Sequence, residues 1–596
     1  MLFQFRKFSL TTTLLVCLVV LAGCDDDSDT VTLVPFNLHT ISVENKQLKL
    51  SWDESASGDG VVYTICEKDL QQPNECNVLA KTSELEKSFA VNTLLRTIES
   101  QYFVMATHDE QLVRSNELLL EPHELTKLIT YIKASNTDAE DNFGSIALSA
   151  NGNTLAVGAV YEDSLSTGIN GDDSDNSGLE VGAVYVYRFD DGVWSQQAYV
   201  KASNTGTDDR FGRSVALSSD GNTLAVGAED EDSSSTGING LDSDNSAENS
   251  GAVYVYRFDG AWSQQAYVKA SNTGAHEHFG SSVALSSDGN TLAVGAVYEN
   301  SSSTGINGVE SDDSAVKSGA VYVYRFDSGW SQQAYVKASN TNTEDRFGRR
   351  VALSSDGNTL AVGAENEDSS STGINGVESD NASESSGAVY VYRFDGDWSQ
   401  QAYVKASNTD AQDLFGHSVA LSMDGNTLAV AAVGEDSPSP NINGGESINA
   451  SESSGAAYVY RFDGGWSQQA YVKASNTDAE DLYGESIALS MDGNTLAVSA
   501  VGEDSSSHGI NGYGSDNSAE KSGAAYVYRF DGDWSQQAYV KASNTGTHEH
   551  FGSSVALSSD GNTLAVGAEN EDSSSTGING DDLDNSAVSA GAVYVY

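Results

Sequence analysis

The sequence predicts an all-β protein in which a small β-sandwich is followed by a seven-bladed β-propeller. Three observations support this fold class. An aromatic residue followed by glycine recurs seven times at intervals of 68 residues. The repeats share the same four short apolar segments, which have the length and composition of β-strands, except that the seventh stops after its third. The 596 residues include 57 Gly but only 5 Pro, which suits many short strands joined by turns.

The repeats predict the blades of a propeller. In the second repeat, strands are expected at residues 214–218, 223–228, 251–256 and 262–270, and Asp220-Gly221 between the first two is a strong hairpin signal. Four antiparallel strands in each of seven repeats match propeller architecture. The aromatic-Gly pairs are Phe143-Gly144, Phe211-Gly212, Phe279-Gly280, Phe347-Gly348, Phe415-Gly416, Tyr483-Gly484 and Phe551-Gly552.

The two ends of the propeller region, residues 126–596, indicate how the ring closes. The seventh repeat stops at Tyr596 and lacks a fourth strand, whereas residues 128–135 align without a gap to the fourth strand of the other repeats. Pairing this early segment with the last repeat would close the ring and remove a free sheet edge. A chain truncated after residue 596 is the alternative interpretation.

The N-terminus predicts export. Arg6 and Lys7 precede a short apolar run and then Leu21-Ala22-Gly23-Cys24, as in a signal peptide covering residues 1–23. This ending resembles the bacterial lipobox, which implies lipid on Cys24 and attachment to a membrane of the cell envelope, facing the periplasm or the cell exterior. Residues 24–30 form an acidic tether. Asp25 within it resembles the inner-membrane retention signal of enteric bacteria.

Residues 31–122 predict the β-sandwich, with strands expected at 48–52, 61–66 and 101–106. Trp52 and Tyr102 resemble the core Trp and Tyr of fibronectin type III domains, while an unrelated small β-sandwich stays open as the alternative. Cys66 and Cys76 are the only cysteines left beyond the signal peptide and the lipidated residue. An oxidising compartment therefore predicts a disulfide between them.

The repeat also resembles a known family. Phe-Gly, a strand, Val-Gly-Ala and then Gly-Ala-Val-Tyr-Val-Tyr is similar to the FG-GAP repeat of integrin α-chain heads. This resemblance implies a propeller that binds proteins or glycans, with calcium in some blades. The family places its calcium loop between the first two strands, but here residues 219–222 are too few to surround calcium with six to eight oxygens. The family's calcium site therefore does not carry over.

An acidic loop of 22 residues, 229–250 in the second repeat, follows the second strand instead. Its carboxylates, amide oxygens and glycines are what a hard cation such as calcium binds. A solvated acidic loop with Asn-Gly turns is the other interpretation. The candidate cation ligands are Glu231, Asp232, Asn239, Asp242, Asp244, Glu367, Asp368, Asn375, Glu571, Asp572 and Asn579.

Charge and motifs exclude several function classes. Thirty Lys and Arg oppose 86 Asp and Glu, a net charge of -56, so no nucleic-acid partner is expected. Two His-Glu-His runs, 276–278 and 548–550, occupy the place of residues 208–210 and are interpreted as variants of a polar turn rather than zinc sites. No Ser/His/Asp or Cys/His arrangement predicts catalysis, and no acidic pair stands out as that of a glycosidase.

The sequence thus favours a lipid-anchored envelope protein without catalysis, an integrin-like adhesion module whose partner is a protein or a glycan. The alternative is a periplasmic scaffold or assembly factor that docks other envelope proteins. Calcium is the one cofactor that the loops could take.

Overall fold

The computed structural model describes residues 31–596 except 57–59, 69–75, 92–93 and 99. The predicted signal peptide, the lipidated Cys24 and the acidic tether with Asp25 lie outside the described residues. Strands dominate the described chain, as the sequence predicts. The two short helices are α1 (Leu94–Thr97) and α2 (Pro122–Thr126).

The N-terminal part consists of two antiparallel sheets that share one core. Trp52 and Tyr102 are both buried in it, and the rings of Trp52 and Tyr63 are 5.6 Å apart. Cys66 and Cys76, on paired strands, form a disulfide. The first sheet has the order β1 (Leu38–Glu44), β2 (Gln47–Trp52), β5 (Glu86–Ala90). The second has the order β4 (Cys76–Thr82), β3 (Val62–Lys68), β6 (Gln101–His108), β7 (Gln111–Arg114), with β8 (Leu118–Leu119) also paired to β6.

The repeats fold into four-stranded antiparallel sheets, the blades of a β-propeller, and seven such sheets lie in the described residues. The first strands are β10 (Phe143–Leu148), β14 (Phe211–Leu217), β18 (Phe279–Leu285), β22 (Arg350–Leu353), β26 (Phe415–Leu421), β30 (Tyr483–Leu489) and β34 (Phe551–Leu557). The second strands are β11 (Thr154–Ala159), β15 (Thr223–Ala228), β19 (Thr291–Ala296), β23 (Thr359–Ala364), β27 (Thr427–Ala432), β31 (Thr495–Ala500) and β35 (Leu564–Ala568).

The third strands are β12 (Ala183–Asp190), β16 (Ala252–Phe258), β20 (Ala320–Phe326), β24 (Ala388–Phe394), β28 (Ala456–Phe462), β32 (Ala524–Phe530) and β36 (Ala592–Val595). The fourth strands are β13 (Val193–Val200), β17 (Trp262–Val268), β21 (Trp330–Val336), β25 (Trp398–Val404), β29 (Trp466–Val472), β33 (Trp534–Val540) and, in the last sheet, β9 (Thr130–Ile132).

The sheets form a closed ring. The first strand of each sheet contacts the first strand of the next, and β34 contacts β10, which returns to the start. Strand β9 pairs with β36, with Tyr131 opposite Tyr594, so the early segment is the fourth strand of the last sheet. It is shorter than residues 128–135, because the backbone N–H groups of Leu128 and Ile129 still bond back to α2.

Aromatic residues and glycines set the packing within and between the blades. Tyr254 and Tyr256 of β16 are fully buried, and Phe211 packs edge-on against Tyr254 at 5.3 Å. Burying one such side chain stabilises the fold by about 1.5–3 kcal/mol. A Cβ on Gly227 would lie 2.0 Å from the carbonyl oxygen of Gly280 in the next blade. Only a glycine therefore allows this approach of the two backbones.

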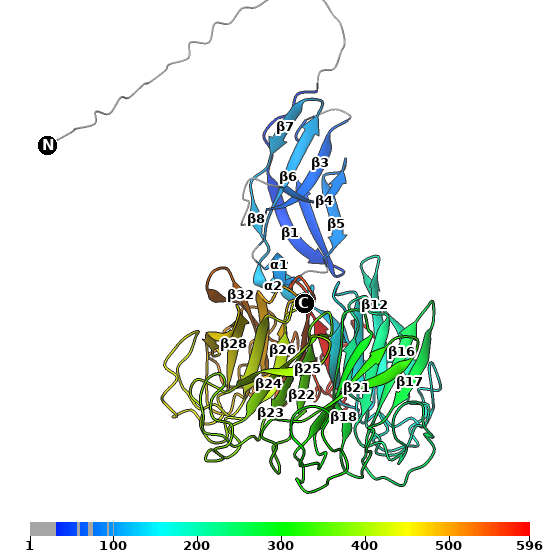
Figure 1. The fold of residues 1–596 in the computed structure, drawn as a ribbon. Coiled ribbons are helices and arrows are strands. Elements are labelled where there is room, and N and C mark those ends of the chain that lie inside the picture. The colour runs from blue at the N-terminus through cyan, green and yellow to red at the C-terminus, as the bar shows by residue number, and fades with distance from the viewer. Residues whose placement is uncertain (1–30, 57–59, 69–75, 92–93, 99) are drawn as a thin grey trace, which may run out of the picture.

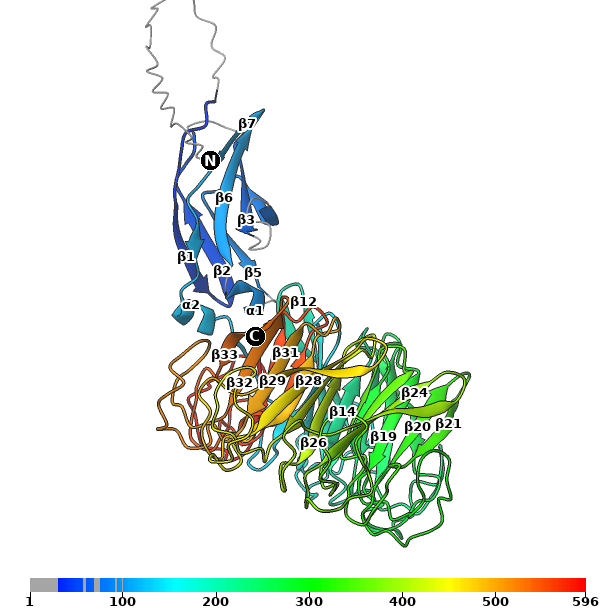
Figure 2. The same cartoon turned by 60° about the vertical axis from the view of Figure 1, so that its left-hand side comes forward.

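The two parts of the chain meet beside the last blades. Figures 1 and 2 show the N-terminal part rising from the propeller next to the C-terminus. Lys46 Nζ donates to the carbonyl of Ile129, just before β9, at 2.5 Å. The backbone N–H of Val43 donates to the carboxylate of Glu124 in α2 at 2.6 Å. Two hydrogen bonds thereby fix the segment that leads into β9 to the N-terminal part.

Candidate functional site

The third residue of each long acidic loop is a glutamate whose side chain points into the protein. In the second blade, Glu231 is 1% exposed. Its Oε2 accepts from Lys269 Nζ at 2.8 Å and its Oε1 from the Tyr267 hydroxyl at 2.9 Å. The same buried ion pair occurs in every blade: Glu162–Lys201, Glu231–Lys269, Glu299–Lys337, Glu367–Lys405, Glu435–Lys473, Glu503–Lys541 and Glu571–Lys133.

This glutamate also ties neighbouring blades together. Asn204, at the end of the preceding blade, donates to Glu231 Oε1 at 2.8 Å and accepts from the Tyr254 hydroxyl at 2.5 Å. Burial lowers the pKa of Lys269, and the charge of Glu231 opposes that shift. A buried ion pair is tolerated when further hydrogen bonds satisfy its atoms, as they do here.

The next predicted ligand, Asp232, fixes the end of the loop just before the third strand. Its Oδ1 accepts the backbone N–H of Asn249 at 2.8 Å, and Asn249 has a φ of 52°. The carboxylate thus compensates a backbone conformation that most residues avoid. Asp368 and Asp572 make the same contact with Ser385 and Ser589.

The predicted ligand Asn239 fastens the middle of the loop to the fourth strand. Its backbone N–H donates to the carbonyl of Tyr267 at 2.7 Å, and its Oδ1 accepts the Tyr267 backbone N–H at 3.0 Å. Asn375 and Asn579 repeat this with Tyr403 and Tyr131.

Asp242 and Asp244 lie farther along the loop. The carbonyl of Asp242 accepts from Asn204 Nδ2 at 2.8 Å, and the Asp244 carboxylate accepts from the Ser234 hydroxyl. In the described part of the chain, no three Asp, Glu, His or Cys side chains gather as a metal would require. The three predicted glutamates bind lysine instead. Calcium binding stays a prediction.

A second buried carboxyl in each blade was missed by sequence reasoning. Asp209 is 3% exposed, and its Oδ2 accepts the backbone N–H of Gly206 at 2.7 Å. Burial, followed by the charge of Glu231, raises the pKa of Asp209 to about 8. The signal was present, because the second residue before each Phe-Gly or Tyr-Gly pair is acidic in all seven repeats: Asp141, Asp209, Glu277, Asp345, Asp413, Asp481 and Glu549.

This row also explains the two His-Glu-His runs. Glu277 takes the place of Asp209, and its carboxylate accepts the backbone N–H of Gly274 at 2.8 Å. His276 is an exposed neighbour, whereas His278 Nδ1 lies 2.9 Å from Asp230 Oδ1. The run is thus a turn around a buried carboxyl, in agreement with its interpretation as a polar-turn variant.

One residue of each loop keeps its side chain out of the contacts described above, although its backbone carbonyl accepts from a serine hydroxyl of the same loop in every blade. It follows the Asn-Gly pair, and it is Asp172, Leu241, Val309, Val377, Gly445, Tyr513 or Asp581 in successive blades. Leu241 is 67% exposed and Tyr513 86%. A framework that repeats almost unchanged therefore carries five residue types at this exposed position, which is called the loop tip below.

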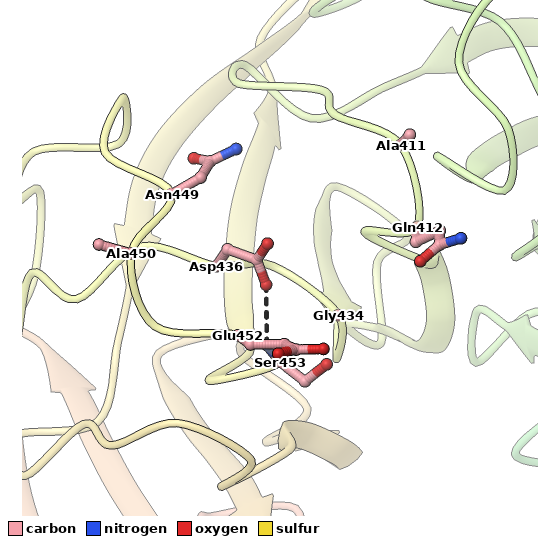
Figure 3. A pocket seen from close by; sticks show the side chains of 8 residues that line it. All are labelled: Ala411, Gln412, Gly434, Asp436, Asn449, Ala450, Glu452 and Ser453. Atoms are coloured by element: carbon pink, nitrogen blue, oxygen red, sulfur yellow. Dashed lines mark hydrogen bonds between the residues drawn. The ribbon is translucent and has the colours of Figure 1, made fainter.

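A polar depression lies beside the long loop of the fifth blade (Figure 3). Across it, Asp436 Oδ1 accepts the backbone N–H of Ser453 at 2.7 Å, the contact that Asp232 makes in the second blade. Its lining contains no His, Lys or Cys that could activate Ser453 as a nucleophile. The lining residues are Ala411, Gln412, Gly434, Asp436, Asn449, Ala450, Glu452 and Ser453.

Structural likenesses are distant. The chain is similar to a periplasmic gluconolactonase of Pseudomonas aeruginosa, with 16% identity, a TM-score of 0.37, and coverage of 82% of this chain and 98% of that one. It is also similar to a Bacteroides uniformis protein assigned as a 6-phosphogluconolactonase, with 10% identity, a TM-score of 0.37, and coverage of 81% and 97%. Likeness at this level does not bear on activity. No curated protein matches the sequence.

Neither described helix is long and apolar enough to cross a membrane.

Family membership rests on the repeats. The FG-GAP repeat model matches six segments, 194–256, 262–324, 330–392, 398–460, 466–528 and 534–596, which together make up more than half of the sequence. The chain therefore belongs to the FG-GAP repeat family, and its four-stranded sheets are the blades of an FG-GAP β-propeller.

Proposed function

We propose that this chain is a lipid-anchored binding protein of the bacterial cell envelope. In this proposal, a seven-bladed propeller carried on a fibronectin type III-like sandwich binds a protein or a glycan without catalysis. The observation that carries the proposal is the design of the loops. A buried Glu and further Asp or Asn side chains hold each loop, while the tip residue is exposed and is one of five residue types across the seven blades. Rigid scaffolds with variable loops are a common basis of recognition.

The orientation of the N-terminal part supports the anchored arrangement. The first described residue, Val31, accepts from Gln111 Nε2 at 3.1 Å, beside the β6–β7 turn. This turn lies at the end of the N-terminal part away from the propeller (Figures 1 and 2). Lipid on Cys24, seven positions before Val31, would thus hold the membrane at the far end and leave the propeller outermost.

The anchor is tested by labelling. Cells that express the chain are fed radioactive palmitate, and label is expected on the wild type but not on Cys24→Ala, which should leave the membrane fraction. Label on Cys24→Ala, or membrane attachment without Cys24, would contradict the anchor.

Display is tested by protease treatment of intact cells. Loss of the propeller supports a surface adhesion module. Full protection until the outer membrane is opened favours the periplasmic scaffold, the alternative that sequence analysis left open.

Recognition by the loop tips is tested with immobilised glycans and envelope or matrix proteins. The purified chain is expected to bind a defined subset, and Leu241→Ser with Tyr513→Ser should weaken that binding. Val78→Ser, at a residue 51% exposed in the N-terminal part, is the matched control. Equal binding by the tip variant and the control would show that the loop tips do not contribute to recognition.

A further inference from the structure

One position of the innermost strands departs from the repeat pattern. The second residue after the aromatic of each aromatic-Gly pair is Ser145, Arg213, Ser281, Arg349, His417, Glu485 or Ser553. By contrast, all seven second-strand segments begin Thr-Leu-Ala-Val. The following position is Ser in five repeats and Ile in one, but it is Arg350 in the fourth. Charged residues have thus replaced small ones at a few sites in an otherwise copied framework.

These charged residues meet at the propeller axis. The first strands of consecutive sheets contact one another around the ring, so they are the innermost strands. Arg350 in the fourth blade is within electrostatic reach of Arg213 in the second and Glu485 in the sixth. Blades that are not neighbours in a ring approach one another only at its axis. The cluster therefore spans the axis.

The carboxylates of the cluster already have partners. Glu365 accepts from Arg349 Nε at 3.2 Å and lies 2.8 Å from His417 Nδ1. His417 Nε2 lies 3.4 Å from Glu485. In the same cluster, Arg213 Nε pairs with Glu229 at 3.1 Å. Glu365 and Glu229 are thereby paired with cations other than Arg350, and Glu485 contacts His417 while also lying within electrostatic reach of Arg350.

Arg350 is the remaining cation. Among the described residues its guanidinium has no hydrogen bond and no carboxylate within ion-pair distance, although it is half-buried. Burial and the charges of Arg349 and Arg213 lower its pKa to about 10, against the opposing charges of Glu485 and Glu365. A desolvated charge without a partner is costly, and an anion that reached it would relieve that cost.

We propose that Arg350 binds a small oxyanion at the propeller axis, with Arg213 and Arg349 beside it. The planar guanidinium offers paired N–H donors that match two oxygens of a carboxylate, phosphate or sulfate group. Both flanking arginines use Nε for their carboxylates and keep further N–H donors for the same anion. The site does not depend on what the loop tips bind.

The test measures anion binding to the purified chain by calorimetry, with inorganic phosphate and with sulfate, at constant ionic strength set by chloride. The wild type is expected to show saturable binding. Arg350→Ser, which restores the residue found in five other repeats, is expected to bind at least tenfold more weakly. Lys81→Ser removes one positive charge from an exposed site of the N-terminal part and should bind like the wild type.

Two results would overturn the site. One is the absence of saturable binding by the wild type, and the other is equal affinity in Arg350→Ser. Arg350→Lys keeps the charge but loses the paired donors, so it should fall between the two. A crystal structure with selenate provides an independent readout: anomalous density at Arg350 supports the site, and its absence there contradicts it.

Discussion

Lys133 and Glu571 are separated by 438 positions in the chain, yet Lys133 Nζ lies 2.8 Å from Glu571 Oε2. In the second blade the same pair, Lys269 and Glu231, is separated by only 38 positions. The last blade therefore takes its lysine, its tyrosine and its fourth strand from the beginning of the propeller region. One buried ion pair links the two ends of the ring.

Removing that lysine should destabilise the last blade. Lys133→Met leaves Glu571 buried without its cation, which is expected to cost about 3–5 kcal/mol in the free energy of unfolding. Denaturant unfolding measures this cost, and amide hydrogen exchange shows where it falls.

The matched control is Lys337→Met, which removes the equivalent pair inside a single repeat. It should lose similar local stability but leave exchange in β9 and β36 unchanged. Unaltered exchange in those two strands in Lys133→Met would contradict the role of the pair in closure.

Stability should fall as the pH rises from about 4 to about 8. Burial raises the pKa of Asp209 to about 8 and that of Asp345 to about 7, above the values of about 4 in an unfolded chain. The folded state then holds protons that the unfolded state has lost, so folding is favoured below this window and weakens through it.

Asp209→Asn isolates one of these groups. It keeps an oxygen that can accept the backbone N–H of Gly206, but it does not titrate. Thermal unfolding should find it more stable than the wild type at pH 8 and close to it at pH 5. The same difference at both pH values would show that Asp209 does not change its protonation in this window.

The disulfide should stabilise only the N-terminal part. Cys66 and Cys76 close a short loop between paired strands, for which chain entropy predicts a loss of about 3 kcal/mol on removal. In the Cys66→Ala/Cys76→Ala double variant, calorimetry should show an earlier transition for this part and an unchanged one for the propeller. An equal shift of both transitions would indicate that the two parts unfold together.

Calcium should leave the melting temperature nearly unchanged. Glu231 and its equivalents bind lysine, which leaves a cation mainly the exposed carboxylates of the loops. Calcium at one hundred times its Kd would stabilise the fold by about 2.7 kcal/mol per site. A rise of that size on adding calcium, reversed by EDTA, would establish the cation sites that sequence analysis raised.

The sequence predicted the blades well because their signals are local. The 68-residue period, the Asp-Gly turns and the alternation of strands can each be read within a single repeat. The length of the closing strand could not be read in this way. Lys46, more than eighty positions earlier, donates a hydrogen bond to the carbonyl of Ile129, and the backbone N–H of Ile129 donates to Thr126 of α2.

The roles of the loop residues, by contrast, could not be predicted from a single repeat. Glu231, Asp232 and Asn239 have the same residue types at their positions in six of the seven repeats, and the third has Asn300 in place of the Asp. Nothing in their spacing distinguishes an inward carboxylate from a metal ligand. Their roles depend on partners in other elements: Lys269 after β17, the backbone of Asn249, and the backbone of Tyr267. The surroundings of Arg350 likewise could not be predicted from its own repeat, because only the closed ring brings Arg213 and Glu485 within electrostatic reach of it.

Strand β9 is synthesised long before the strand with which it pairs. Its partner β36 begins at Ala592, about 460 positions later. At about 5–20 residues per second, a ribosome needs roughly 20–90 seconds to make that stretch. Throughout this interval β9 lacks its partner, so the nascent chain carries an unpaired strand until β36 has left the ribosome.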